Sequence, residues 1–147
     1  MADSQFAKLL KDHPFGFFAD PMTLRPLKPW LPIVQADWMP NARDMRLSKP
    51  VAFIDPNGHI WRAATGRVVD GMSSPRLLWR IQPPFVGRGR EGSVIHDVAC
   101  VDKLRPSSEV HWVFWCAMRA RRMSPWEAWW RWAGTRVRGP RFRGTAK

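Results

Sequence analysis

Residues 90–133 read REGSVIHDVACVDKLRPSSEVHWVFWCAMRARRMSPWEAWWRWA and predict three consecutive helices. Apolar residues recur at helical spacing over residues 90–101, and again from Ser107 or Ser108 to about residue 122. The segment Ser124-Pro125-Trp126-Glu127 then starts a third helix, with a serine cap, a proline at the first helical position and a glutamate placed for a capping box. This segment is the most specific local signal in the chain.

Upstream of the helices, the sequence changes to short β-prone runs. Residues 51–54 and 59–61 are separated by the turn residues Pro56-Asn57-Gly58, which predicts a β-hairpin. A third strand is expected through residues 67–69. Together with the helices, these strands predict an α+β fold.

The two ends of the chain differ from this middle part in composition. Residues 12–50 contain seven prolines, each of which fixes φ and removes a hydrogen-bond donor. We therefore expect residues 1–46 to form a Pro-rich extended arm that wraps over a surface, either of its own core or of a neighbouring subunit. Residues 47–135 should form a single α+β domain, with a small antiparallel β element and three packed helices. Residues 136–147, which are rich in Gly, Pro and Arg, should form a solvated basic tail.

The overall charge indicates a class of partner. The chain has 147 residues, a net charge of +12 and ten tryptophans. Such an excess of positive charge favours polyanionic partners, which are nucleic acid, an anionic membrane face or an acidic patch on another protein. The first eleven residues lack the pattern of a secretory signal, and no apolar stretch is long enough to span a membrane, so the expected starting compartment is the cytoplasm.

The cysteines and histidines give no metal pattern. Cys100 and Cys116 have neither the CxxC spacing of a metal site nor the density of a disulfide scaffold, so both are expected to be reduced and buried. Combined with His96 and His111, they still match no known zinc spacing. We therefore predict no metal site and no cofactor.

Two short motifs carry the candidate catalytic residues Asp70, Ser73, His96 and Asp97. The motifs are Asp70-Gly71-Met72-Ser73-Ser74-Pro75-Arg76 and His96-Asp97. They resemble the signatures of a phage and prophage family of unknown function, and the order of elements in that family is kept from about residue 51 to residue 130. The resemblance implies a phage-derived gene, whose product is part of a virion or an accessory protein used during infection.

A catalytic interpretation of His96 needs a second group to orient its ring. Neighbouring residues on a helix point about 100° apart, so Asp97 and His96 do not face each other, while Ser93 and Cys100 share the face of His96. Asp70, at a strand end, is the natural orienting carboxylate. The competing interpretation is structural: Asp70 caps a turn or helix, and His96 hydrogen-bonds a buried backbone group.

A second resemblance concerns the glycine-rich turn before the His-Asp helix. Gly87-Arg88-Gly89 followed by His96-Asp97 and Cys100 is similar to phospholipase A2, in which a calcium loop precedes a helix that carries a general base. The chain departs from that family in two ways. Arg88 and Arg90 place two cations in the loop, which opposes calcium binding, and no second Asp lies near His111 to orient the base.

The C-terminal part of the chain combines arginines with tryptophans. On a helix Trp126, Trp129 and Trp130 would share one face, whereas Trp132 would point elsewhere. Three interpretations compete: the stripe packs as core on the preceding helix, it lies on an anionic membrane, or the basic tail neutralises nucleic-acid phosphates without sequence specificity. The candidate interface or polyanion-binding residues are Arg119, Arg122, Trp126, Trp129, Trp130, Arg131, Arg138, Arg141 and Arg143.

These observations lead to two hypotheses of function. The first is a virion-associated structural or assembly protein of a phage tail or head, which docks onto other phage structural proteins in an oligomeric assembly through its arm and basic Trp-rich end. It would reside in the virion, and in the host cytoplasm during assembly. The alternative is a hydrolase of envelope lipid or peptidoglycan that uses His96 with Asp70 or Asp97.

Overall fold

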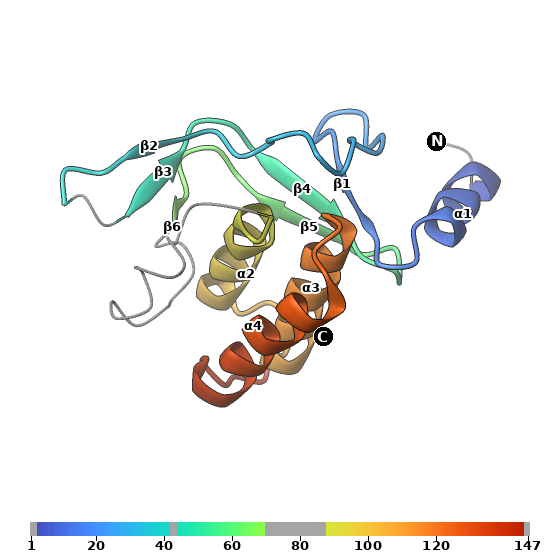
Figure 1. Cartoon of the computed structure of the whole chain (residues 1–147). Coiled ribbons are helices and arrows are strands. Elements are labelled where there is room, and N and C mark those ends of the chain that lie inside the picture. The colour runs from blue at the N-terminus through green and yellow to red at the C-terminus, as the bar shows by residue number, and fades with distance from the viewer. Residues whose placement is uncertain (1–2, 42–43, 70–87, 146–147) are drawn as a thin grey trace.

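The computed structural model describes residues 3–41, 44–69 and 88–145 (Figure 1). The fold is α+β, as predicted, with small antiparallel sheets and three C-terminal helices. Its elements in chain order are α1 (Asp3–Asp12), β1 (Phe17–Ala19), β2 (Ala36–Trp38), β3 (Met45–Leu47), β4 (Val51–Ile54), β5 (Ile60–Ala63), β6 (Val68–Val69), α2 (Arg90–Asp102), α3 (Ser107–Ala120) and α4 (Pro125–Arg138). Within the described residues, no helix has the length and apolar content needed to cross a membrane.

The predicted hairpin is confirmed as β4 and β5, which pair antiparallel. Its turn is held by the buried Asp55 carboxylate, which accepts hydrogen bonds from the backbone N–H groups of Asn57 and His59 at 2.8 and 3.0 Å. The indole N–H of Trp61 donates to the same carboxylate at 2.9 Å. Strand β1 joins the other edge of β4, giving the order β1-β4-β5.

The strand expected at residues 67–69 is present as β6, but it pairs with β3 instead of adding to the β4–β5 edge. The register explains this arrangement. Val51 pairs with Ala63, and Arg46, five residues before Val51, pairs with Val68, five residues after Ala63. Strands β3–β4 and β5–β6 are therefore two arms of one long hairpin, interrupted next to Pro50, which has no N–H to donate to a ladder. Strand β2 completes the second sheet, in the order β2-β3-β6.

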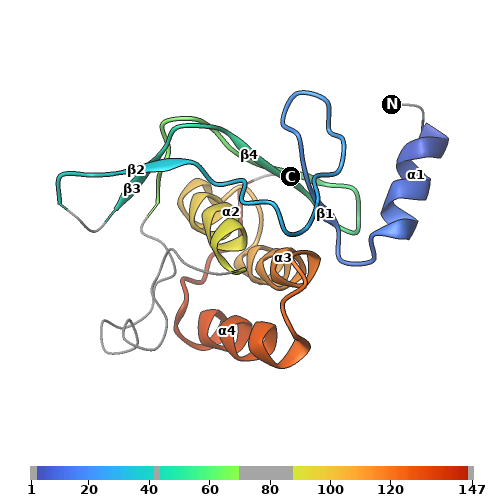
Figure 2. The same cartoon turned by 45° about the horizontal axis from the view of Figure 1, so that its top comes forward.

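The three predicted C-terminal helices form layers against the strands (Figures 1 and 2). Helix α2 contacts β4, β5 and β6, α3 contacts α2 and β1, and α4 packs on α3. The largest group of buried residues lies between the sheets and the first two of these helices, and it includes Phe53, Trp61 and Val94. The predicted Ser124 cap and the proline at the first helical position are confirmed, since the Ser124 hydroxyl accepts a hydrogen bond from the Glu127 N–H at the start of α4. The Glu127 carboxylate accepts from Arg131 instead of closing a capping box.

The N-terminal segment packs on the protein's own core through part of its aromatic content. Phe17 and Phe18 are buried in β1, while Trp30 and Trp38 are exposed. Helix α1 precedes the first proline of this segment, and its apolar side chains pack against a small group that contains Phe17. The sequence left open whether this segment covers its own core or a neighbouring subunit. Phe17 and Phe18 pack in the chain's own core.

Candidate functional site

Two of the four candidate catalytic residues are placed by the structure. Asp70 and Ser73 lie outside the described residues, so their proposed pairing with His96 stays a prediction. His96 and Asp97 lie on α2, and the His96 Nδ1 atom is 3.9 Å from the nearer Asp97 carboxylate oxygen, beyond hydrogen-bond distance. Both side chains are largely buried, with 12% and 14% of their side-chain area exposed.

The ring of His96 is oriented by a second histidine. His96 Nε2 lies 2.9 Å from His111 Nδ1 on α3, and His111 Nε2 lies 3.2 Å from the Pro140 carbonyl oxygen. A carbonyl only accepts, so His111 donates from Nε2 and, when neutral, accepts at Nδ1. His96 must then donate from Nε2, which leaves the lone pair of the neutral ring on its Nδ1. The His96–His111 relay therefore sets the tautomer of both rings.

Electrostatics keep the His96–His111 relay neutral. Burial lowers the pKa of His96 to about 3, with a smaller contribution from neighbouring His111. Burial also lowers the pKa of His111, aided by the positive charge of Arg136 and opposed by the hydrogen bond to Pro140. Because both rings remain uncharged at neutral pH, His96 is a weak proton acceptor.

Cys100 lies close to the His96–His111 relay, but the cysteines do not make the relay a metal site. The Cys100 sulfur is 3.7 Å from His96 Nε2, and burial raises the pKa of the Cys116 thiol to about 12. Both thiols are free of disulfides, as expected, and Cys100 is only partly buried. Among the described residues, no group of three or more His, Cys, Asp or Glu side chains could hold a metal ion.

Three of the four tryptophans of α4 lie on the outside of the molecule, so the interpretation in which their stripe packs as core is wrong. Trp126, Trp129 and Trp130 are 72%, 49% and 41% exposed. The face that packs inward carries Ala128 and Arg131, and the half-buried Trp132, expected to point elsewhere, packs on the group that contains Phe114. An arginine can occupy this inner face because its guanidinium is paired with Glu127 at 2.8 Å, so its charge is not buried alone.

The outer face of α4 is locally ordered. The rings of Trp126 and Trp129 stack with centroids 5.5 Å apart and planes 17° apart. The Arg131 guanidinium lies 5.3 Å from the centre of the Trp130 ring, within the range of a cation–π contact. We call these three exposed tryptophans the α4 tryptophan face.

The candidate basic residues divide into two groups. Arg119 and Arg122 make contacts within the protein: Arg119 donates to the Met123 carbonyl at 2.6 Å and lies over Phe15, and Arg122 lies over Trp30. Arg131 is buried and paired, as described above. Arg138, Arg141 and Arg143 are exposed, as is Arg122 despite its contact with Trp30.

The C-terminal segment is less solvated than its composition predicts. The Ser107 N–H donates to the Phe142 carbonyl at 3.0 Å, and the Thr145 N–H donates to the Lys103 carbonyl at 2.9 Å. Phe142 packs against the main core, and Pro140 accepts from His111. The segment is thus held against the α2–α3 corner while its arginines face solvent. Sequence reasoning missed the role of Pro140, because no local signal identifies a backbone acceptor 29 residues from its donor.

Comparison with known proteins places these features in a family. Residues 45–135, more than half of the chain, match the family described as "Protein of unknown function (DUF1353)". The chain belongs to this DUF1353 family. It is also 42% identical over 83 residues to the "Uncharacterized protein y4jT" of Sinorhizobium fredii strain NBRC 101917 / NGR234. That alignment covers 56% of this chain but 25% of the relative, so the chain matches about a quarter of the relative's length. No solved structure matches the chain.

The DUF1353 match includes both candidate sites. It runs from β3 into α4, so it contains His96, His111 and the α4 tryptophan face. The segment that contains α1, β1 and β2 precedes it. An expected membership in a family of unknown function is therefore confirmed.

Proposed function

We propose that the chain is a structural or assembly protein of a phage-derived particle, and that it docks onto an acidic, partly apolar surface of a neighbouring particle protein. The observation that carries this proposal is the α4 tryptophan face, in which three large aromatic side chains are 41–72% exposed. Tryptophan is enriched among the residues that contribute most to protein interfaces. Phage origin enters through the resemblance of the two sequence motifs.

The geometry of the α4 tryptophan face favours recognition of a protein. Each Trp side chain offers roughly 150–250 Å² of contact area and has only two side-chain torsions to immobilise. The stacking of Trp126 on Trp129 and the Arg131 contact with Trp130 restrict these torsions before any partner binds. A preordered aromatic surface loses less conformational entropy on binding than a mobile one.

The charge around the α4 tryptophan face indicates an acidic partner. The acid on α4, Glu127, is already paired with Arg131. Arg136, Arg138 and Arg141 are exposed at the end of α4 and just beyond it. Carboxylates around an apolar patch on the partner would match this arrangement and would increase the association rate.

The state of His96 supports docking over hydrolysis. A general base near neutral pH works best with a pKa close to the operating pH, whereas the pKa of His96 is lowered to about 3. Its Nε2 is also engaged by His111. These facts support a structural role for the His96–His111 relay.

The test is to purify phage-derived particles from cells that produce the full chain and to measure its copy number by quantitative mass spectrometry. A fixed copy number per particle is expected for the wild type, and a loss of at least about tenfold for the Trp126→Ser/Trp129→Ser double variant, because interface tryptophans often contribute 2 kcal/mol or more. The matched control is Val101→Ser, at a 70% exposed apolar residue on α2, outside both the N-terminal arm and the α4 tryptophan face, which should keep the wild-type copy number.

Three outcomes would overturn the proposal. One is absence of the wild-type chain from particles. Another is tryptophan-dependent binding of the purified chain to anionic vesicles or to duplex DNA that matches its binding to particles. The last is hydrolysis of envelope lipid or peptidoglycan that is lost in His96→Ala and unchanged in the tryptophan double variant.

A further inference from the structure

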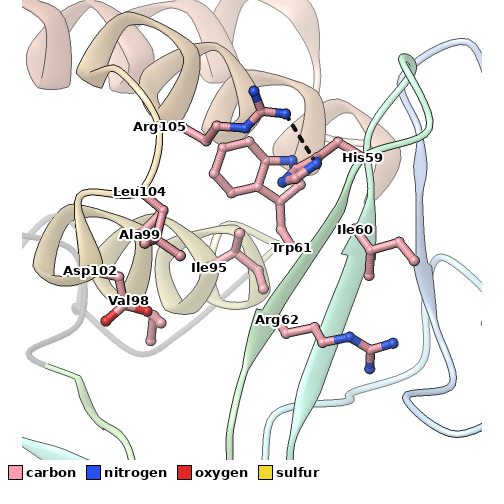
Figure 3. Close-up of a pocket in the computed structure, with 10 residues that line it drawn as sticks. All are labelled: His59, Ile60, Trp61, Arg62, Ile95, Val98, Ala99, Asp102, Leu104 and Arg105. Carbon is pink, nitrogen blue, oxygen red and sulfur yellow. Dashed lines mark hydrogen bonds between the residues drawn. The ribbon is translucent and has the colours of Figure 1, made fainter. Parts of the chain in front are cut away.

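A small pocket lies between the β4–β5 hairpin and the corner that joins α2 to α3. Figure 3 shows the residues that line it, which come from β5, from the second half of α2 and from the following loop; the side chains of Ile60 and Arg62 extend away from α2. Its volume is about 80 Å³. This is several times the roughly 10–15 Å³ that one water molecule needs, so the pocket accommodates a small group of several non-hydrogen atoms. It contains no residue of the α4 tryptophan face.

The inner wall of the pocket is apolar. Ile95, Val98 and Ala99 line it from α2, and Trp61 lines it from β5 (Figure 3). Ile95 and Val98 are only 2% and 3% exposed, so this wall belongs to the protein core and its shape is fixed. An apolar wall of this size fits a short aliphatic group.

One end of the pocket carries hydrogen-bond donors. The Arg105 Nη2 atom lies 3.1 Å from His59 Nδ1 (Figure 3). Because a guanidinium only donates, His59 accepts at Nδ1 and a neutral His59 ring carries its proton on Nε2. Arg105 and His59 therefore place a guanidinium and an imidazole N–H at the same end of the pocket.

The formal charges around the pocket cancel. Arg62, Arg67 and Arg105 provide three positive charges, and Asp55, Asp102 and Glu109 provide three negative ones. Arg67 is paired with Asp102 at 2.6 Å, and Arg105 lies 3.6 Å from Glu109. An anion is therefore favoured locally, by the hydrogen-bond donors of Arg105 and His59, and not by an excess of charge.

We infer that this pocket binds a short aliphatic monocarboxylate, with its carboxylate on Arg105 and its hydrocarbon against Ile95 and Val98. Arginine suits this task because its planar N–H groups can donate two parallel hydrogen bonds to one carboxylate. The same chemistry is present in a free branched-chain acid and in the C-terminal residue of a peptide that ends in Leu or Val. This site is independent of the proposed docking function.

Titration of the ¹⁵N-labelled full chain with isovalerate, followed by amide NMR spectra, tests the inference. Saturable shifts are expected for backbone amides of residues 98–105 and for the Trp61 indole N–H. Isopentanol, which keeps the hydrocarbon but lacks the charge, should bind about tenfold more weakly, because hydrogen bonds to charged groups are the stronger ones. N-acetyl-leucine separates the two sources: tighter binding than isovalerate indicates a peptide C-terminus, and weaker binding indicates a free acid.

Two variants with a matched control complete the test. Ala99→Leu fills the pocket and should abolish the shifts, while Val101→Leu, at a 70% exposed position on the same helix that does not line the pocket, should leave them intact. Arg105→Gln should weaken isovalerate binding about tenfold and bring it to the level of isopentanol. Equal binding of isovalerate and isopentanol, shifts that persist in Ala99→Leu, or an absence of saturable shifts would each overturn the inference.

Discussion

Between α2 and α3 the chain buries ionisable side chains, whereas on the outer face of α4 it exposes aromatic ones. Glu91 of α2 and Arg121, at the C-terminal end of α3, form an ion pair at 3.3 Å with 4% and 7% of their side-chain areas exposed. His96 and His111 join the same two helices through a hydrogen bond. On α4, three tryptophans remain in contact with water. Polarity alone therefore does not tell which part of this molecule faces solvent.

The difference between the two regions follows from the availability of partners. The Glu91 Oε1 atom accepts from Arg121 at 3.3 Å and from the Ile33 N–H at 3.5 Å, whereas Glu91 Oε2 and Arg121 Nε are buried without a hydrogen-bond partner among the described residues. The ion pair therefore compensates part of the desolvation of these two charges. The inner face of α4 is occupied by Ala128 and Arg131, and Trp126, Trp129 and Trp130 turn outward.

The largest expected effect comes from breaking the buried ion pair. Arg121→Ala should lower the free energy of unfolding by about 3–5 kcal/mol, because it leaves the Glu91 carboxylate buried without its charge partner. The measurement is urea unfolding followed by circular dichroism. In the control Arg121→Met/Glu91→Met, both charges are absent and the loss should be clearly smaller. A loss below about 1 kcal/mol for Arg121→Ala would mean that this region is not the buried polar core described here.

The next effect is the pH dependence of stability that arises from His96. The folded state holds the pKa of His96 at about 3, below the value of 6.5 expected in the unfolded chain, so the unfolded state binds more protons between these values. This contribution to stability is complete above pH 6.5 and is lost as the pH falls. Between pH 6.5 and 4 the loss should reach about 3 kcal/mol, at about 1.36 kcal/mol per pH unit.

Urea unfolding at a series of pH values from 7 to 4 checks this expectation. The His96→Phe variant removes the titrating ring, so its stability should fall less steeply over this range, whatever its stability at pH 7. The slope of the free energy of unfolding against pH reports proton binding, whereas a change in packing shifts the free energy equally at every pH. If the slope of His96→Phe equals that of the wild type, the ring is not held neutral by the fold.

Local chemistry explains which parts of the fold were predictable from the sequence. The Ser124 cap and the Asn57-Gly58 turn act within a few residues, so their signals determined the start of α4 and the position of the hairpin. The pairing of β6 with β3 and the bond from His111 to Pro140 depend on residues more than 20 positions apart. Helical periodicity located the tryptophans of α4 on one face, but it did not tell whether that face packs on α3 or contacts solvent.

The smallest expected effect distinguishes the α4 tryptophan face from a core. The Trp126→Ser/Trp129→Ser double variant should change the free energy of unfolding by about 1 kcal/mol or less, because both rings are exposed and stack on each other. Serine and tryptophan have similar helix propensities, so the backbone contribution should nearly cancel. The positive control is Met118→Ala, at a fully buried α3 side chain in the Phe114 group, which should lose about 2–5 kcal/mol in the same urea titration. A loss of about 2–5 kcal/mol in the tryptophan variant would place these rings in a packed interior, and the docking proposal would lose its main support. A loss near zero would mean that these side chains do not stabilise the fold, which agrees with a role in binding a partner.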